Sequence, residues 1–131
     1  MPGTLESLET ILIKYPQFDI YAFVGTGSGE LGAITSWFSS WPSMHFEISS
    51  YQVPFGQEST FIRRSFLQKN NITINDSYAH IFDTVLYLEM LSKNARVLFI
   101  NVLGGVIRHH DDTKTFAGIP KEDNVKFDGL H

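Results

Sequence analysis

The residues with the clearest potential for chemistry lie in a glycine-rich segment over residues 23–32, which reads FVGTGSGELG. A strand-like run precedes its glycines, a helix-like run follows them, and the last six residues fit G-x-G-x-x-G. Glycine has no Cβ, so backbone N–H groups can approach a ligand closely, and the N-terminus of a following helix favours anionic groups. Glu47 stands 20 positions after Gly27, where an acid could hydrogen-bond ribose hydroxyls. The pattern indicates a nucleotide or dinucleotide site, although a tight turn with Glu47 facing solvent would use the same residues.

A second group of polar residues, His109 to Asp112, combines two histidines with two aspartates. Four consecutive side chains cannot all turn toward one ion without a contorted backbone, so we expect a polar loop and no metal site. One of the histidines could still act as an acid–base group at the rim of a crevice. Ser28 lacks the first glycine of G-x-S-x-G, so a serine hydrolase is not indicated.

Composition limits the classes that remain. The chain has 131 residues, 43% of them apolar, which predicts one globular domain with a packed core. It has no cysteine, so disulfides, thiolate zinc sites and cysteine nucleophiles are excluded. The formal charge of −4 does not indicate a nucleic-acid surface, and Arg63, Arg64 and Lys69 are expected to form a solvated face. We expect a cytoplasmic protein without a membrane segment, because no signal peptide and no apolar run of about 20 residues is present.

Hydrophobic spacing predicts the elements around the glycine segment. A helix is expected over residues 4–15, with Thr4 as its N-cap and Pro16 beyond its end. Residues 19–24 form a short apolar run typical of a buried strand. Apolar residues at steps of three and four then predict a helix over residues 31–41.

The second half of the chain continues the alternation. Residues 44–53 and, briefly, 71–75 are predicted as strands, and residues 54–70 as a loop with a short helix. The longest predicted helix covers residues 77–93 and is so apolar that it is either sandwiched or packed on a partner. Residues 96–103 form the strongest predicted strand.

Strands that alternate with helices predict an α/β fold: a Rossmann-like three-layer domain with a short, mainly parallel sheet over residues 1–110. Residues 111–131 are expected to form a mostly irregular tail packed on this domain. In open parallel sheets, ligands bind beyond the carboxyl ends of the strands. If the strands over 19–24 and 96–103 are neighbours, the glycines at their ends flank one crevice.

Residues 23–31 resemble the first motif of Rossmann-like S-adenosylmethionine-dependent methyltransferases, in which an apolar strand runs into G-x-G-x-G. The resemblance implies that Gly25, Gly27 and Gly29 line the methionine part of the cofactor and that Glu47 takes the ribose. The chain departs from the family pattern at Phe23, where methyltransferases usually carry an acid.

The family's fourth strand usually ends in an Asp/Asn-Pro-Pro-aromatic motif, and this chain has Asn101-Val102-Leu103-Gly104 there. The expected function is binding of an adenosine-containing cofactor, S-adenosylmethionine first, with methyl transfer as the implied reaction. The alternative is a non-catalytic Rossmann-like module that senses a nucleotide or docks on a protein or a second copy through the helix over 77–93. The candidate cofactor-binding residues are Gly25, Thr26, Gly27, Ser28, Gly29, Glu47 and Asn101.

Overall fold

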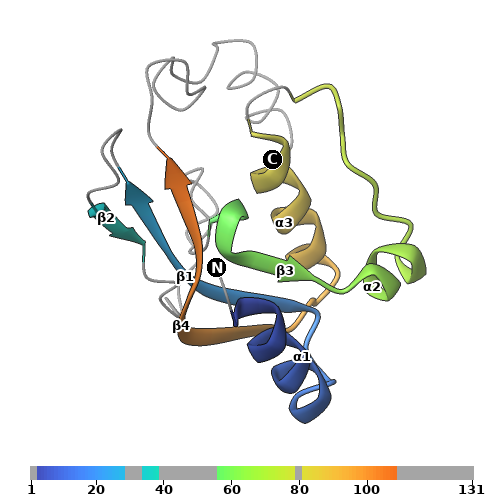
Figure 1. The fold of residues 1–131 in the computed structure, drawn as a ribbon. Coiled ribbons are helices and arrows are strands. Elements are labelled where there is room, and N and C mark those ends of the chain that lie inside the picture. The colour runs from blue at the N-terminus through green and yellow to red at the C-terminus, as the bar shows by residue number, and fades with distance from the viewer. Residues whose placement is uncertain (1–2, 29–33, 39–55, 79–80, 109–131) are drawn as a thin grey trace.

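A small α/β domain with a mixed sheet is the architecture of this chain in a computed structural model that describes residues 3–28, 34–38, 56–78 and 81–108 (Figure 1). Within those ranges the sheet has four strands. The elements follow in the order α1 (Thr4–Lys14), β1 (Ile20–Ser28), β2 (Ile34–Phe38), the 3-10 helix η2 (Gln57–Ser59), β3 (Thr60–Ile62), α2 (Arg64–Lys69), α3 (Phe82–Ser92) and β4 (Val97–Arg108).

Strand β1 organises the sheet, because it pairs with each of the other described strands. β3 runs antiparallel to its first residues, and β2 runs antiparallel to its last residues. β4 runs parallel to β1 from Ile20 to Ser28. The expected adjacency of the first and last strands is therefore confirmed. The sheet of the described residues is mixed, however, whereas a mainly parallel sheet was expected.

The glycine segment is where the structure differs most from the expectation. β1 does not end at Val24 but continues through Gly25, Thr26, Gly27 and Ser28. The predicted helix over 31–41 is wrong for its described residues, because Ile34–Phe38 form β2 and Ser28 pairs with Ile34. The β2 sequence ITSWF is rich in β-branched and aromatic residues, which favour a strand once a partner strand is available. Pairing with β1 thus overrides the helical spacing.

Strand β4 is longer than predicted and irregular. It continues through Gly104 and Gly105 to Arg108. Ile100 pairs with Phe23 and Leu103 pairs with Val24, so two residues of β4 are inserted between those pairs. A Cβ on Gly104 would collide with Phe23. Bulges of this kind bend a strand, and glycine lets the bent strand lie close to its neighbour.

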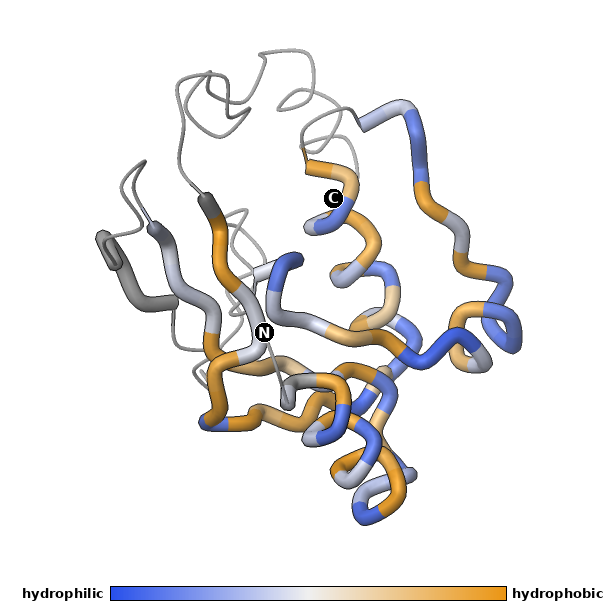
Figure 2. Tube along the Cα trace, in the orientation of Figure 1, coloured by the Kyte–Doolittle hydropathy of each residue, from blue (hydrophilic) through white to orange (hydrophobic). Residues whose placement is uncertain are grey.

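The main core lies between the sheet and α3. Ile20 and Ala22 of β1 pack with Leu86, Tyr87 and Met90 of α3, and all five are buried. Figure 2 shows the apolar residues concentrated along β1, the first half of β4 and α3. A second cluster groups Tyr78, Ile81 and Val85. The apolar residues of the predicted helix over 77–93 are thus sandwiched within the domain, although the helix itself begins at Phe82.

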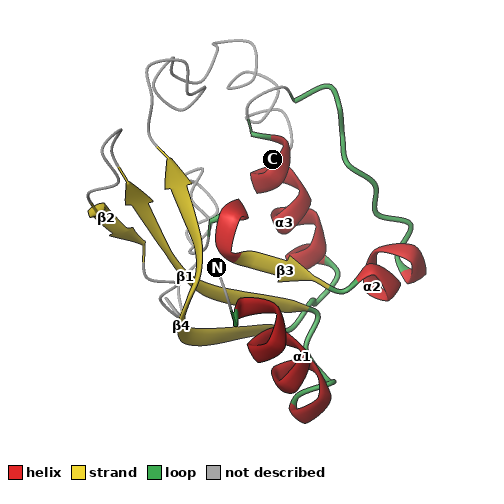
Figure 3. Cartoon of the chain, in the orientation of Figure 1, coloured by secondary structure: helices red, strands yellow, loops and turns green. Residues whose placement is uncertain are grey.

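Figure 3 shows the helices, strands and loops with which the remaining expectations are compared. The first helix is confirmed over Thr4–Lys14, but its N-cap is Gly3, and α2 supplies the short helix expected within 54–70. The strand over 71–75 is wrong, because the positive φ of Asn71 (54°) breaks an extended run. The predicted strand over 44–53 and the tail over 111–131 lie outside the described residues. No helix of the described residues is long and apolar enough to cross a membrane.

Candidate functional site

The predicted cofactor-binding residues are only partly brought together. Gly25, Thr26, Gly27 and Ser28 are consecutive, buried positions of β1. Asn101 is exposed in the irregular part of β4. The other two candidates, Gly29 and Glu47, and the polar group His109 to Asp112 lie outside the described residues. Because β2 pairs antiparallel with β1, the strand–turn–helix setting on which the cofactor expectation rested is not formed, and the cofactor itself stays a prediction.

Gly25 has a specific packing role in the structure. It pairs with Gly105 of β4, so two glycines stand side by side in the sheet. A Cβ on Gly25 would lie 2.6 Å from Glu58 Oε1 and 3.0 Å from Ser59 Oγ. A Cβ on Gly105 would collide with the backbone carbonyl of Glu58. The missing side chains therefore create the space in which η2 sits against β1 and β4, as Figure 1 shows for η2 beside the upper part of β4.

Glu58 is the ionisable residue that this packing positions. Its carboxylate lies over Gly25 and over Gly56, where a Cβ would be 2.7 Å from Oε2. The side chain is half-buried, and among the described residues its carboxylate has neither a hydrogen bond nor an ion pair. Its neighbour Ser59 is buried and donates a hydrogen bond to the Gly56 carbonyl oxygen at 3.4 Å.

Tyr87 of α3 lies near Glu58 and Thr60. The pKa of Tyr87 is raised to about 12 by burial first and then by the negative charges of Asp83 and Glu58, while a hydrogen bond with Thr60 lowers it. The Thr60 hydroxyl donates to the Gly56 carbonyl oxygen at 2.6 Å. At neutral pH the Tyr87 phenol is therefore uncharged, and two carboxylates from different elements act on it. We call Glu58, Thr60, Asp83 and Tyr87 the Glu58 site.

The Glu58 site is electrostatically suited to a cation. Two carboxylates surround a neutral phenol, and no group of three or more acidic, histidine or cysteine side chains that could hold a metal ion occurs among the described residues. Ligands with one positive charge and several N–H donors, such as an ammonium or a guanidinium, match carboxylate acceptors.

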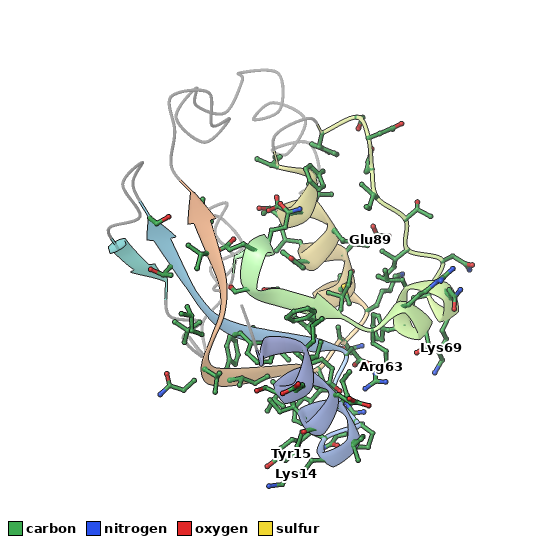
Figure 4. The ribbon with its side chains drawn as sticks, viewed as in Figure 1. Lys14, Tyr15, Arg63, Lys69 and Glu89 are labelled. Atoms are coloured by element: carbon green, nitrogen blue, oxygen red, sulfur yellow. The ribbon has the colours of Figure 1, made fainter. Side chains whose placement is uncertain are left out.

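Arg63, which lies between β3 and α2, does not belong to the solvated face that the sequence predicted for it. The Arg63 side chain donates to the Phe18 carbonyl oxygen at 3.0 Å and to the Tyr21 hydroxyl at 2.6 Å. Its guanidinium also lies over the Tyr21 ring, 5.7 Å from the ring centre. Arg64 and Lys69 are exposed, as expected. Figure 4 shows Arg63 between the sheet and α2 and Lys69 at the outer end of α2. Arg63 thus has a structural role, because it holds the Phe18 backbone and the Tyr21 side chain together.

Sequence reasoning missed Glu58, Asp83 and Tyr87. These three residues belong to no sequence motif. They come close together because η2 and α3 both pack against the sheet. The one local signal is Gly56, two residues before Glu58, which leaves room for a carboxylate that folds back on its own chain.

No protein family model matches the chain, and no curated protein matches it.

Proposed function

We propose that this chain is a non-catalytic protein-interaction module whose Glu58 site receives a positively charged side chain, arginine or lysine, of a protein partner. The observation that carries the proposal is the half-buried Glu58 side chain, whose carboxylate has no cationic partner among the described residues. A carboxylate removed from water costs free energy unless a positive charge or hydrogen-bond donors compensate it. A partner's cation would supply both.

The surroundings of Glu58 support a cationic ligand over an anionic one. Asp83 and Glu58 both act on the Tyr87 phenol and raise its pKa, so the local potential is negative. The formal charge of the chain is −4, which adds long-range attraction for a basic partner. A phosphate-bearing ligand at Gly25 would instead meet the Glu58 carboxylate, and like charges repel.

S-adenosylmethionine remains the second candidate for one specific reason. Its sulfonium is a cation, so the Glu58 carboxylate above Gly25 could attract it, whereas S-adenosylhomocysteine lacks that charge. The two molecules share the adenosine group, and their comparison separates charge recognition from adenosine recognition.

The proposal is tested by NMR titration of the ¹⁵N-labelled full chain with N-acetyl-arginine amide at millimolar concentration. Backbone signals of residues 56–60 and 83–87 should shift, and the uncharged N-acetyl-norleucine amide should leave them in place. Equal shifts with both probes, or none with the arginine probe, would contradict recognition of a cation.

Parallel titrations with S-adenosylmethionine, S-adenosylhomocysteine, NAD and ATP test the second candidate. Binding of S-adenosylmethionine alone, stronger than that of the arginine probe, would replace the protein partner by this cofactor. Binding of all four adenosine compounds would restore a nucleotide site and overturn the proposal.

A further inference from the structure

Helix α1 is the least anchored helix of the described residues. Its two most exposed apolar side chains are Ile13 and Leu5, at 75% and 72% exposure. Where burial is described, no residue of α1 is buried, and neither core cluster includes a side chain from it. Isolated helices of about this length are marginal in water, so α1 depends on its attachment to the sheet.

The attachment is a relay of hydrogen bonds at the C-terminal end of α1. The Tyr21 hydroxyl donates to the Tyr15 carbonyl oxygen at 2.8 Å and accepts from Arg63 at 2.6 Å. Arg63 donates in addition to the Phe18 carbonyl oxygen at 3.0 Å. Tyr21 is 1% exposed, so the relay ties residues 15–18 to a rigid position in β1. Figure 4 shows Tyr15 at the end of α1 and Arg63 at the start of α2.

We infer that α1 is a detachable strap, which opens as a unit about residues 15–19 while the sheet and α3 stay folded, and that the Tyr15–Tyr21–Arg63 relay sets how often it opens. Opening would leave both core clusters intact, because Leu8, Ile11 and Leu12 are partly exposed and belong to neither cluster. It would also release the Tyr21 hydroxyl from Tyr15. The inference does not depend on the proposed function.

Hydrogen exchange followed by mass spectrometry tests the strap on the full chain. In the unmodified protein, amides of residues 4–15 should exchange at least about tenfold faster than those of residues 82–92. Equal protection of the two helices would overturn the inference, because a strap that opens alone must exchange faster than the core.

Arg63→Lys and its neighbour Arg64→Lys form the matched pair. Lysine keeps the charge but lacks the planar fork that reaches Phe18 and Tyr21 together, so Arg63→Lys should speed exchange of residues 4–18 about tenfold and leave residues 82–92 unchanged. Arg64→Lys should change neither segment, since Arg64 is exposed. Faster exchange of both helices by the same factor in Arg63→Lys would overturn the relay as a local control.

The Tyr21→Phe variant gives a second measurement. It keeps the ring in the core and removes the hydroxyl from both hydrogen bonds. Selective acceleration of residues 4–18 is expected again. Unchanged exchange of residues 4–18 in both Arg63→Lys and Tyr21→Phe would contradict the inference.

Discussion

Single glycines determine where Glu58 lies. Gly25 and Gly56 leave the space that its carboxylate occupies, and Gly105 admits its backbone. Gly25, from the glycine segment that suggested a cofactor loop, thus acts in packing against η2. The chemical character of this place comes from the acid above the glycine, and the glycine contributes room.

Tyr87 should make stability depend on alkaline pH. Its pKa is raised to about 12 in the folded protein from 10.0 in a model compound, so the folded state resists ionisation. The stability it contributes is complete below pH 10 and is lost as pH rises toward 12, because the unfolded chain then releases the proton more readily. The loss should be about 3 kcal/mol.

This loss is measured by urea unfolding between pH 9 and pH 12 for the unmodified chain and for Tyr87→Phe. Other tyrosines and the lysines titrate in both proteins, so the difference between the two curves isolates Tyr87. Parallel curves across this range would contradict the raised pKa.

At the level of elements, the packing of η2 on β1 and β4 determines where the Glu58 backbone lies. Its two glycine partners differ in what a methyl group would meet. At Gly25 the nearest atom belongs to the flexible Glu58 side chain, whereas at Gly105 it is the Glu58 backbone carbonyl. A side chain can move aside more easily than a backbone segment that leads into β3.

Gly105→Ala should therefore destabilise the domain more than Gly25→Ala. The expected cost is about 1–3 kcal/mol for Gly105→Ala, typical of overpacking, and smaller for Gly25→Ala. Urea unfolding at neutral pH measures both. Equal stability of the two variants, or a larger loss of stability for Gly25→Ala, would contradict the described packing of η2 against β1 and β4.

Some of these elements could be predicted from the sequence, and others could not. Helix α1, helix α3 and the pairing of the first and last strands follow from spacing and fold rules, because these segments are strongly patterned. Strand β2 was missed because Ile34 and Phe38 fit a helical face as well as a strand, and only pairing with β1 decides between them. Glu58 and Tyr87 were missed because 3-10 helices and tertiary packing have no periodic signal.

For the whole molecule, both the net charge and the arrangement of the elements favour binding of a cation. The chain is acidic overall, and the Glu58 site places carboxylates from η2 and α3 together on the framework of the sheet. This concentration of negative charge is suited to attracting a partner's cation.

Binding of the arginine probe should weaken as ionic strength rises. Raising salt from 0.01 M to 0.15 M shortens the screening length from about 30 Å to about 8 Å, which removes the long-range attraction of the acidic chain. The affinity should fall severalfold in NMR titrations at the two salt concentrations. An affinity that is independent of salt would show that apolar contact, and not charge, holds the probe.

We expect the Glu58 carboxylate to be the group that recognises the cation. Titration of Glu58→Gln and of Glu89→Gln with the arginine probe tests this directly. Both variants remove one negative charge while keeping side-chain size, and Glu89 lies on α3 outside the Glu58 site (Figure 4). We predict that Glu58→Gln abolishes the shifts at residues 56–60 and 83–87 while Glu89→Gln retains them. Loss of binding in both variants to the same degree, or retention in Glu58→Gln, would contradict the account.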